Sequence, residues 1–464
     1  MGYDVLVIGS GPGGYVAAIR AAQYGLKVGV VEKDPKLGGT CLHVGCIPTK
    51  ALLHFAEAYE TALHGSSFGV VAQDVSLDLA RMGRRKDQIV DKHAGGIGQL
   101  FKKHGIDTIP GFGSLQGNGA VRVDGPSDSR VVRASSVILA TGSEARLIPG
   151  VESTSDRILT NVEILDIDRL PESLAIIGAG AVGVEFASMY RSFGSEVCVF
   201  EMLPRIVPLE DEDVSAGLLR AFRSRGIEVS VSTRIESVVE SVGHVELAYQ
   251  PPSGDPQMRR FDKLLVAVGR KPNTERVGLE NTAIETQRGF IPVNGYMETA
   301  EMGVYAIGDI VAGSPQLAHV ASAEGLVAAA RIAGRPVEPI DYNLSPNCTY
   351  CEPQVASVGL TEEAARERGR PIKVSKFPFA ANSKASILGS HAGFVKIVAD
   401  EEFGEILGVH ILGPQATELI HEAIVAMQSE ATVESMRATI HAHPTLSEAV
   451  LDAFNAIQGQ AINA

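Results

Sequence analysis

Residues Asp4–Glu32 form the stretch DVLVIGSGPGGYVAAIRAAQYGLKVGVVE, which decides the fold of the N-terminal part of the chain. An apolar strand leads into a G-x-G-x-x-G turn at Gly9, Gly11 and Gly14, and a helical run, a further glycine and a second apolar strand follow. In such a βαβ unit the first glycine makes the tight turn, the second lets the backbone approach a pyrophosphate, and the third packs the helix on the strand. Because the helix N-terminus adds free N–H groups and a positive dipole end, the stretch predicts a dinucleotide site.

The same pattern occurs a second time in Ser173–Glu201, SLAIIGAGAVGVEFASMYRSFGSEVCVFE, which aligns with the first copy without a gap. Its glycines are Gly178, Gly180 and Gly183. One isolated G-x-G-x-x-G is weak, because any tight strand–helix turn can carry it, but two copies with strand, helix and terminal acid in register are a strong signal. The repeat predicts an α/β protein with two Rossmann-like dinucleotide-binding domains.

Each copy ends in an acid, Glu32 in the first and Glu201 in the second, where a carboxylate can accept hydrogen bonds from ribose hydroxyls. Glu201 carries a negative charge where the 2′-phosphate of NADP would lie, so we expect the second site to prefer NAD. Arg205 is close enough in the sequence to keep NADP open as an alternative.

Three further apolar strands that end in a glycine turn follow the repeats, and they are expected within Ser135–Ser143, Asp262–Asn273 and Gly303–Val311. From about Tyr342 onward the chain has no phosphate loop. It ends in the helical run ATELIHEAIVAMQ and the segment TIHAHPTLSEAV, which together predict a C-terminal domain of a different kind.

The composition narrows the classes of function. The formal net charge of −14 argues against a nucleic-acid partner, and five cysteines in 464 residues are no disulfide framework. No apolar run approaches membrane-spanning length, and the first strand begins too early for a signal segment. Leu6 occupies the position where myristoylation of Gly2 requires Ser or Thr. We therefore expect a protein of the reducing cytoplasm without a membrane anchor.

Two thiols stand close together in GGTCLHVGCIPTK, residues 38–50, at the mouth of an Ala-rich helical run. In a regular helix the Cα atoms of Cys41 and Cys46, five positions apart, would be about 8–9 Å from each other. A disulfide needs less than about 7 Å. Either the two thiols do not pair, or the helix entrance is distorted, and Gly45 and Pro48 are the residues that could distort it.

These motifs together resemble the flavin-dependent pyridine nucleotide–disulfide oxidoreductases over essentially the whole chain. The most specific ones are GGTCLHVGCIPTK, the paired nucleotide motifs, AIGD at residues 306–309 and HAHPTLSE at residues 441–448. The resemblance is strongest to the members that oxidise dihydrolipoyl groups. It implies FAD in the first nucleotide fold, NAD in the second, and an α+β C-terminal domain that forms a homodimer. The expected domains are 1–147 for FAD, 148–275 for NAD, 276–341 as a central domain that completes the FAD site, and 342–464 as the interface domain.

The resemblance also implies the catalytic residues. Cys41 and Cys46 would form a redox-active disulfide, with Cys46 facing the flavin and Cys41 exchanging with the substrate, so the helix entrance should be bent. His443 would be the base that deprotonates a substrate thiol, oriented by Glu448, and it would come from the other subunit of the dimer. The bond before Pro444 is one that can be cis at modest cost.

Lys50 lies four residues after Cys46 and hence on the same helical face. By resemblance its cation sits near the flavin and pairs with Glu185; without the resemblance, Lys50 would be a generic surface lysine and Glu185 a solvated helix residue. The cysteine motif departs from the usual family pattern at His43, where Asn is common, and at Thr49, where Ser is frequent.

The remaining implied contacts belong to the two cofactors, and no metal site is expected. Those for FAD are Gly9, Gly11, Gly14, Glu32, Lys50, Gly113, Thr141, Gly142, Ser143, Asp309 and Ala318. Those for NAD are Gly178, Gly180, Gly183, Glu185, Glu201, Gly269 and Arg270. Asp309 would bind the ribityl chain; without the resemblance it would be an N-cap of the next helix, and the two roles can coexist. We expect only a positional role for His319.

Cys348 and Cys351 form a C-x-x-C, which alone could mean a second redox pair or half of a zinc site. No second C-x-x-C exists, and Cys198 lies inside a predicted strand. We therefore expect reduced cysteines on a strand of the interface domain.

The function that the resemblance implies is oxidation of protein-bound dihydrolipoyl groups, with electrons passing through the disulfide and FAD to NAD. The partners would be the lipoyl and subunit-binding domains of a 2-oxo acid dehydrogenase complex, or the lipoyl protein of glycine cleavage. An NAD(P)H-dependent reductase of a small disulfide is the alternative. A mercuric-ion or thioredoxin reductase usually needs C-terminal cysteines that the tail QGQAINA lacks, and the intact set of reacting residues disfavours a purely structural flavoprotein.

Overall fold

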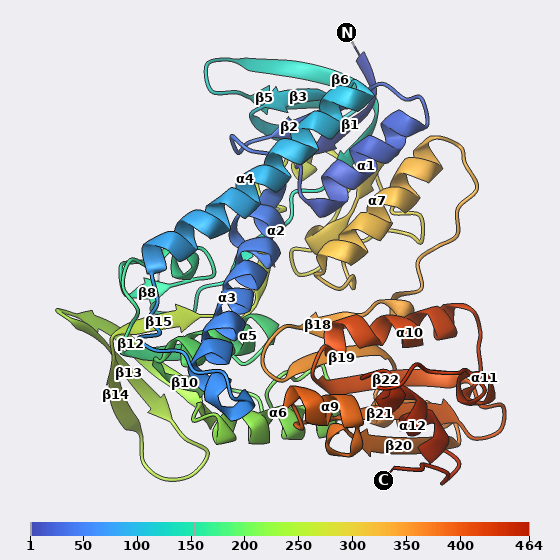
Figure 1. Cartoon of the computed structure of the whole chain (residues 1–464). Coiled ribbons are helices and arrows are strands. Elements are labelled where there is room, and N and C mark those ends of the chain that lie inside the picture. Colours follow the sequence, from blue (N-terminus) through green and yellow to red (C-terminus); the bar gives the residue numbers. More distant parts are fainter. Residues whose placement is uncertain (1, 152–153, 464) are drawn as a thin grey trace. The chain divides into compact units, whose positions relative to one another are not determined.

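The computed structural model describes residues 2–151 and 154–463 of the chain (Figure 1). The chain divides into two compact units. The first comprises the described residues of Met1–Ala51, Leu79–Arg146 and Arg270–Tyr342, and the second those of Leu52–Asp78, Leu147–Gly269 and Asn343–Ala464. Each unit contains one copy of the nucleotide-binding repeat.

The first unit is built on a seven-stranded sheet in the order β3-β2-β1-β6-β5-β4, with β17 paired to β6. Its strands are β1 (Gly2–Ile8), β2 (Val28–Glu32), β3 (Asp107–Pro110), β4 (Phe112–Leu115), β5 (Ala120–Asp124), β6 (Ser129–Leu139) and β17 (Val304–Ala306). β1, β2, β3, β6 and β17 run parallel, whereas β4 and β5 pair antiparallel. Ligands bind open sheets of this kind outside the carboxyl ends of the parallel strands.

The core of the first unit has two faces because successive side chains of a strand point to opposite sides of the sheet. In β1, Val5 and Val7 are buried against the helices, and Leu6 and Ile8 are buried in a second cluster on the other face. The helices of this unit are α1 (Pro12–Gln23), α2 (Gly39–Val44), α4 (Leu79–His104) and α7 (Ala318–Ile332). α1 and α7 lie side by side (Figure 1). A short antiparallel pair, β7 (Ser143–Ala145) with β16 (Arg270–Pro272), completes the unit.

The second unit repeats the parallel βαβ architecture in a five-stranded sheet, β11-β10-β9-β15-β8. Its strands are β8 (Ile158–Leu159), β9 (Ser173–Ile177), β10 (Glu196–Phe200), β11 (Glu228–Ser230) and β15 (Lys263–Val266). Its helices are α5 (Ala181–Phe193) and α6 (Glu212–Ser224). A three-stranded antiparallel sheet of β12 (Arg234–Ser241), β13 (His244–Gln250) and β14 (Gln257–Phe261) follows. The three strands predicted after the repeats are confirmed. They are β6, which ends within Ser135–Ser143, β15 within Asp262–Asn273 and β17 within Gly303–Val311.

The C-terminal part of the second unit is a five-stranded antiparallel sheet, β18-β19-β22-β21-β20. The strands are β18 (Asn347–Thr349), β19 (Gln354–Gly359), β20 (Ile372–Pro378), β21 (Phe394–Asp400) and β22 (Ile406–Gly413). The helices are α8 (Glu362–Glu367), α9 (Ser383–Leu388), α10 (Ala416–Gln428), α11 (Val433–Arg437) and α12 (Glu448–Ala456). α10 and α12 pack on the sheet, and α10 coincides with the predicted helical run.

The first glycine turn leaves no room for side chains at two positions. Gly9 has a φ of +102°, and a Cβ there would lie well under 3.0 Å from the carbonyl oxygen of Ala140. A Cβ on Gly14 would collide with the carbonyl oxygen of Gly9 itself. At Gly11, by contrast, nothing lies within 4 Å of the Cβ position, so the backbone is open to a ligand. The three glycines therefore have the separate roles that their spacing predicts.

The second turn reproduces this geometry. Gly178 has a φ of +103°, a Cβ on Gly183 would collide with the carbonyl oxygen of Gly178, and nothing lies within 4 Å of the Cβ position at Gly180. The helices that follow the two turns, α1 and α5, have no side-chain cap at their N-termini, so the N–H groups of their first turns remain available for phosphate oxygens.

A buried ion cluster joins α6 to the antiparallel sheet within the second unit. Lys396 on β21 is 3% exposed, and its ammonium lies 2.8 Å from carboxylate oxygens of Asp211, Asp213 and Glu362. Burial acts to lower the pKa of Lys396, but hydrogen bonds to these carboxylates raise it above the usual value, so the lysine stays charged. The cluster fixes the start of α8, where Glu362 lies, against the N-terminus of α6.

Replacement of Gly183 by alanine should destabilise the second unit, because the added methyl group collides with the Gly178 carbonyl. Overpacking of this kind costs about 1–3 kcal/mol or more, which corresponds to a melting temperature lowered by roughly 3–10 °C. Thermal unfolding followed by circular dichroism measures the change. Gly180→Ala is the matched control, since its methyl group enters open space at a φ of −73°, and equal losses for both variants would contradict the packing role of Gly183.

Candidate active site

The two thiols at the helix entrance lie on different helices. α2 ends at Val44, Gly45 breaks the helix with φ −140° and ψ −120°, and α3 (Cys46–His64) begins at the second cysteine. A Cβ at Gly45 would lie 2.9 Å from the carbonyl oxygen of Thr40, so a side chain would crowd the break. The expected distortion of the helix entrance is confirmed, and its cause is Gly45.

This break brings the side chains of Cys41 and Cys46 into hydrogen-bond contact, with both present as free thiols. The pKa of the Cys41 thiol is raised by this hydrogen bond and by burial, whereas the ammonium of Lys50 acts to lower it. A cation beside a thiol pair favours the thiolate form that exchange chemistry requires. The geometry therefore provides two neighbouring sulfur atoms and one nearby positive charge.

The two departures from the usual motif have local hydrogen bonds of their own. His43 Nε2 lies 2.9 Å from the carbonyl oxygen of Leu37, and the Thr49 hydroxyl donates to the carbonyl oxygen of Gly45 at 2.7 Å. Thr49 thus helps to hold the helix break, as a serine hydroxyl also could.

Glu32 ties the first nucleotide turn to the end of β2. The backbone N–H and the hydroxyl of Ser10 both donate to Glu32 Oε2, at 2.8 and 2.5 Å, and the N–H of Asp34 donates to Oε1 at 3.0 Å. The carboxylate is 6% exposed and keeps further acceptor capacity on both oxygens. With the open backbone at Gly11 and the uncapped helix α1, these residues fit the adenosine and pyrophosphate part of FAD.

Glu201 has the equivalent position in the second turn. It accepts the N–H of Ala179 on Oε2 at 2.7 Å and the N–H of Leu203 on Oε1 at 2.8 Å, and it is 8% exposed. The acid is therefore held rigidly beside the glycine turn, where it can accept ribose hydroxyls and repel a 2′-phosphate.

Asp309 lies in a short 3₁₀ helix (Gly308–Ile310) after β17, and its carboxylate accepts the hydroxyl of Ser143. The guanidinium of Arg270 donates to the hydroxyl and the carbonyl oxygen of Ser143, at 2.6 Å each, and lies 3.8 Å from the Asp309 carboxylate. The alternative that Asp309 caps the next helix is wrong, because α7 begins at Ala318 and its N-cap residue is Leu317.

Arg270, which the resemblance assigned to NAD, thus has its contacts among residues assigned to FAD. It reaches them because β16 pairs with β7, which brings Arg270 opposite Ala145 and Pro272 opposite Ser143. Gly269, by contrast, belongs to the second unit and has a φ of +110° with open space around its Cβ position.

Glu324 is a residue of this region that sequence reasoning missed. It is fully buried on α7, and its carboxylate accepts the N–H of Gly308, the hydroxyl of Ser314 at 2.6 Å and that of Tyr342 at 2.7 Å. Burial raises the pKa of Glu324, while the three donors act against that shift. The carboxylate holds the loop that carries Asp309. The one signal in the sequence was the single acid of α7, which stands in a mostly apolar run.

The other residues assigned to FAD belong to the same unit. Gly113 is on β4, where a Cβ would lie 3.0 Å from the side chain of Ile8; Gly142 has a φ of +68°; and Ala318 is the first residue of α7. The Thr141 hydroxyl donates to the carbonyl oxygen of Asn273 at 2.7 Å. His319 is the second residue of α7.

His443 and Glu448 form the predicted pair. His443 Nδ1 lies 2.9 Å from Glu448 Oε1, the N–H of Thr445 donates to Glu448 Oε2 at 2.8 Å, and the His443–Pro444 bond is cis. Partial burial acts to raise the pKa of Glu448, but the Thr445 N–H and the His443 ring lower it, so the carboxylate stays ionised near neutral pH. The His443 side chain is 70% exposed, which leaves Nε2 open to a substrate.

His441 is a different kind of histidine, although it belongs to the same motif. Its side chain is only 6% exposed, with Nε2 2.6 Å from Glu422 and Nδ1 3.1 Å from the carbonyl oxygen of Thr439. Both ring nitrogens are thus occupied. This agrees with the choice of His443 as the base.

Glu185 is buried on α5 at 5% exposure, so the description of it as a solvated helix residue is wrong. Its carboxylate accepts the N–H of Tyr350 at 2.9 Å because α5 packs against the segment after β18. The ion pair with Lys50 stays a prediction.

Cys348 and Cys351 are not in a disulfide; the first lies on β18 and the second just after it. The Cys351 thiol contacts the carbonyl oxygen of Pro353 at 3.2 Å, and burial raises its pKa well above the usual value. A buried, protonated thiol is a poor nucleophile, in keeping with the expectation of structural, reduced cysteines. Cys198 is likewise a free thiol on β10, as predicted.

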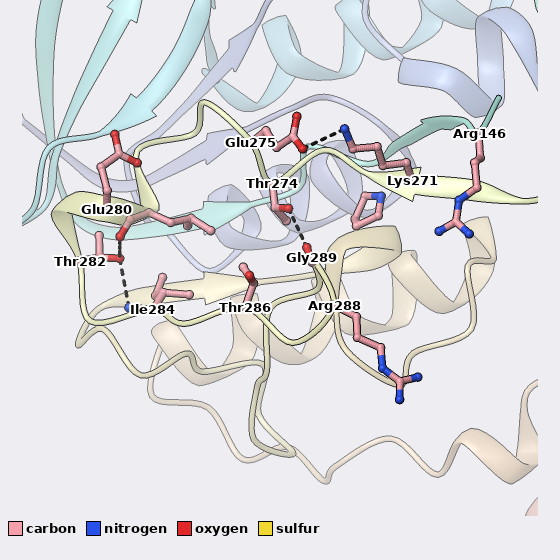
Figure 2. A pocket seen from close by; sticks show the side chains of 12 residues that line it. Arg146, Lys271, Thr274, Glu275, Glu280, Thr282, Ile284, Thr286, Arg288 and Gly289 are labelled. Carbon is pink, nitrogen blue, oxygen red and sulfur yellow. Dashed lines mark hydrogen bonds and ion pairs between the residues drawn. The ribbon is translucent and has the colours of Figure 1, made fainter. Parts of the chain in front are cut away.

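A pocket of about 610 Å³ lies in the first unit between β16, Arg146 and residues 274–289 (Figure 2). Figure 2 shows the ion pair of Lys271 with Glu275, 2.8 Å long, and the hydrogen bond from Thr274 to the carbonyl oxygen of Gly289, at 2.6 Å. None of the residues predicted for catalysis or for cofactor binding lines this pocket, so we do not assign it to the candidate active site.

Within the described part of the chain, no helix is both long and apolar enough to cross a membrane. Comparisons with known proteins agree with the fold. A profile of the pyridine nucleotide-disulphide oxidoreductases matches residues 3–325, and a profile of the dimerisation domain of these enzymes matches residues 345–454.

Relatives resemble the chain over its full length. It is 44% identical to dihydrolipoyl dehydrogenase of Bacillus subtilis over 99% of both chains, and 43% identical to that of Rhizobium etli over 100% of this chain and 99% of the other. Among solved structures, LpdA of Mycobacterium tuberculosis has a TM-score of 0.90 at 27% identity over 98% of this chain and 99% of that chain. The HOCl-induced flavoprotein disulfide reductase RclA of Escherichia coli has a TM-score of 0.87 at the same identity and coverage. The chain therefore belongs to the pyridine nucleotide–disulphide oxidoreductases, flavoenzymes that bind FAD and a pyridine nucleotide and carry a dimerisation domain.

Proposed function

We propose that this enzyme is a dihydrolipoyl dehydrogenase, which oxidises protein-bound dihydrolipoyl groups and reduces NAD. The observation that carries the proposal is the exposed His443 ring held by Glu448 at 2.9 Å. A dithiol substrate has to lose protons before it can attack a disulfide, and an oriented imidazole with a free Nε2 is suited to accept them. The names of the full-length relatives support the same choice.

The exchange step follows from the contact between Cys41 and Cys46. In the oxidised enzyme these residues would form a disulfide. One substrate thiol gives its proton to His443 Nε2, and the resulting thiolate attacks Cys41 Sγ, which breaks the disulfide and releases the Cys46 thiolate. The second substrate thiol then displaces Cys41, which leaves as a thiol that carries this second proton, and the lipoyl disulfide closes. The substrate has lost two electrons and two protons; the cysteine pair has gained the two electrons, and the protons are on His443 and Cys41.

Bound FAD would supply the two-electron redox chemistry that links the cysteine pair to NAD. The first glycine turn and Glu32 would hold its adenosine part, and Asp309 its ribityl chain. The Lys50 ammonium would favour negative charge near the flavin, and Glu185 would be its partner. At the second turn, Glu201 would select NAD because its carboxylate repels a 2′-phosphate.

The proposed active unit is a homodimer in which His443 of one subunit serves the cysteines of the other. The dimerisation-domain match over residues 345–454 supports the dimer. We propose the domain boundaries 1–147, 148–275, 276–341 and 342–464. The partners would be the lipoyl and subunit-binding domains of a 2-oxo acid dehydrogenase complex, or the lipoyl protein of glycine cleavage. We propose a place in the reducing cytoplasm, where a disulfide between Cys41 and Cys46 would be catalytic and not structural.

Steady-state kinetics of the purified holoenzyme test the function directly. We expect kcat/KM for dihydrolipoamide with NAD to exceed that for glutathione disulfide with NADPH by at least about 10²-fold, since only the first pair matches both the dithiol chemistry and Glu201. The opposite order would establish the alternative, a reductase of a small disulfide.

His443→Gln should lose dihydrolipoamide turnover by about 10²–10⁴-fold while FAD stays bound, because a positioned general base is removed. His441→Gln is the matched control from the same motif: its ring is buried and both its nitrogens have partners, so turnover should change far less. Subunit exchange between His443→Gln and Cys41→Ser enzymes should restore part of the activity, since a mixed dimer rebuilds one complete site. Near-normal turnover in His443→Gln would exclude its role as the base, and proven heterodimers without recovery would exclude a shared site.

The two cysteines should differ in their visible absorbance spectra. Cys41→Ser leaves the thiolate of Cys46 free to face the flavin, so a long-wavelength charge-transfer band should be present without added reductant. Cys46→Ser should lack this band at every pH. Both variants should lose dihydrolipoamide oxidation. If the band follows Cys41 instead, the roles of the two thiols are reversed.

A further inference from the structure

The loop that follows Glu201 folds back on the second nucleotide turn. The N–H of Leu203 donates to the Glu201 carboxylate at 2.8 Å, and the N–H of Val207 donates to the carbonyl oxygen of Ala179 at 2.8 Å. Arg205 lies between these two anchors. Its backbone is therefore held next to both the acid that faces the ribose and the turn that faces the pyrophosphate.

The side chain of Arg205 is directed to another part of the second unit. Its guanidinium forms an ion pair with Glu363 on α8, with a distance of 3.4 Å from Nη2 to Oε2, and 35% of the arginine side chain is exposed. This ion pair links the nucleotide-binding sheet to the antiparallel part of the unit.

Glu363 is attached to a fixed piece of backbone. The side chain of Thr361 caps α8 by accepting the N–H of Ala364 at 3.1 Å. The neighbouring Glu362 donates its N–H to Asp211 at 3.1 Å, and its carboxylate lies 2.8 Å from the buried Lys396. The first turn of α8 thus presents the Glu363 carboxylate to Arg205 at a defined place.

A guanidinium near the ribose is the group with which proteins of this fold accept the 2′-phosphate of NADP. Arg205 has the charge and the location for that role, but its charge is directed to Glu363. We propose that Glu363 is a positioning residue that holds Arg205 away from the ribose edge and so strengthens the preference for NAD over NADP. The inference rests on the proposed use of a pyridine nucleotide at the Glu201 site, and it adds a second determinant from a different part of the chain.

The test measures binding of adenosine 2′,5′-bisphosphate and of 5′-AMP to the holoenzyme by isothermal titration calorimetry. The two probes differ by the 2′-phosphate alone. In Glu363→Gln the affinity for the bisphosphate relative to 5′-AMP should rise by about two- to fivefold, the scale of an exposed ion pair. The ratio of kcat/KM for NADP over NAD should rise with it, and both gains should shrink at high salt.

Two further variants make the test specific. Glu367→Gln removes the same charge from the same helix at an exposed position, and should leave the relative affinity unchanged. In an Arg205→Gln background, Glu363→Gln should produce no gain. The inference would be overturned if the relative affinity for the bisphosphate did not change in Glu363→Gln. It would also be overturned if this affinity rose equally in Glu367→Gln or in the Arg205→Gln background. Failure of the proposed function can be told apart from failure of this inference. In that case the wild-type enzyme would not reduce NAD with dihydrolipoamide, whatever its relative affinity for the two probes.

Discussion

The contact between the third glycine of each nucleotide turn and the carbonyl oxygen of the first is the constraint on which the rest of this structure depends. At Gly14 and Gly183 no Cβ fits, so helices α1 and α5 can approach their strands closely. The middle glycines are left open, and the helix N-termini are left without side-chain caps. One backbone arrangement therefore lets the helix pack closely on its strand and leaves the turn open to a dinucleotide. The chain contains this arrangement twice.

The terminal acids of the two repeats complete that arrangement. Glu32 and Glu201 each accept the N–H of the residue after the first glycine and a second N–H from the chain beyond the strand. A buried carboxylate with two backbone donors is held rigidly, as the proposed selectivity against a 2′-phosphate requires. In the proposed function, the carboxylate that selects the cofactor is therefore held by a hydrogen bond that also holds the turn.

A glycine also shapes the thiol site, but through a break in a helix. Gly45 separates α2 from α3, so Cys41 and Cys46 meet although five positions of regular helix would keep them apart. The resemblance required a bend, and Gly45 was one of two residues that could supply it. Pro48 instead lies inside α3, within the first turn, where proline is tolerated.

The sequence by itself determined the local patterns: both βαβ repeats, the strands that follow them, helix α10 and the identity of the paired thiols and of His443 with Glu448. Spacing and residue type are sufficient for the repeats, the strands and the helix, because each pattern spans a few tens of residues at most. The pairing of the thiols and the choice of His443 with Glu448 came from the resemblance to the family, since spacing alone left the thiol pairing open. Only the tertiary structure decided the partners of Arg270, the burial of Glu185 and Glu324, and the ion pair of Arg205 with Glu363. These contacts join residues that are distant in the chain, and no local period records which strand or helix will pack opposite a given side chain.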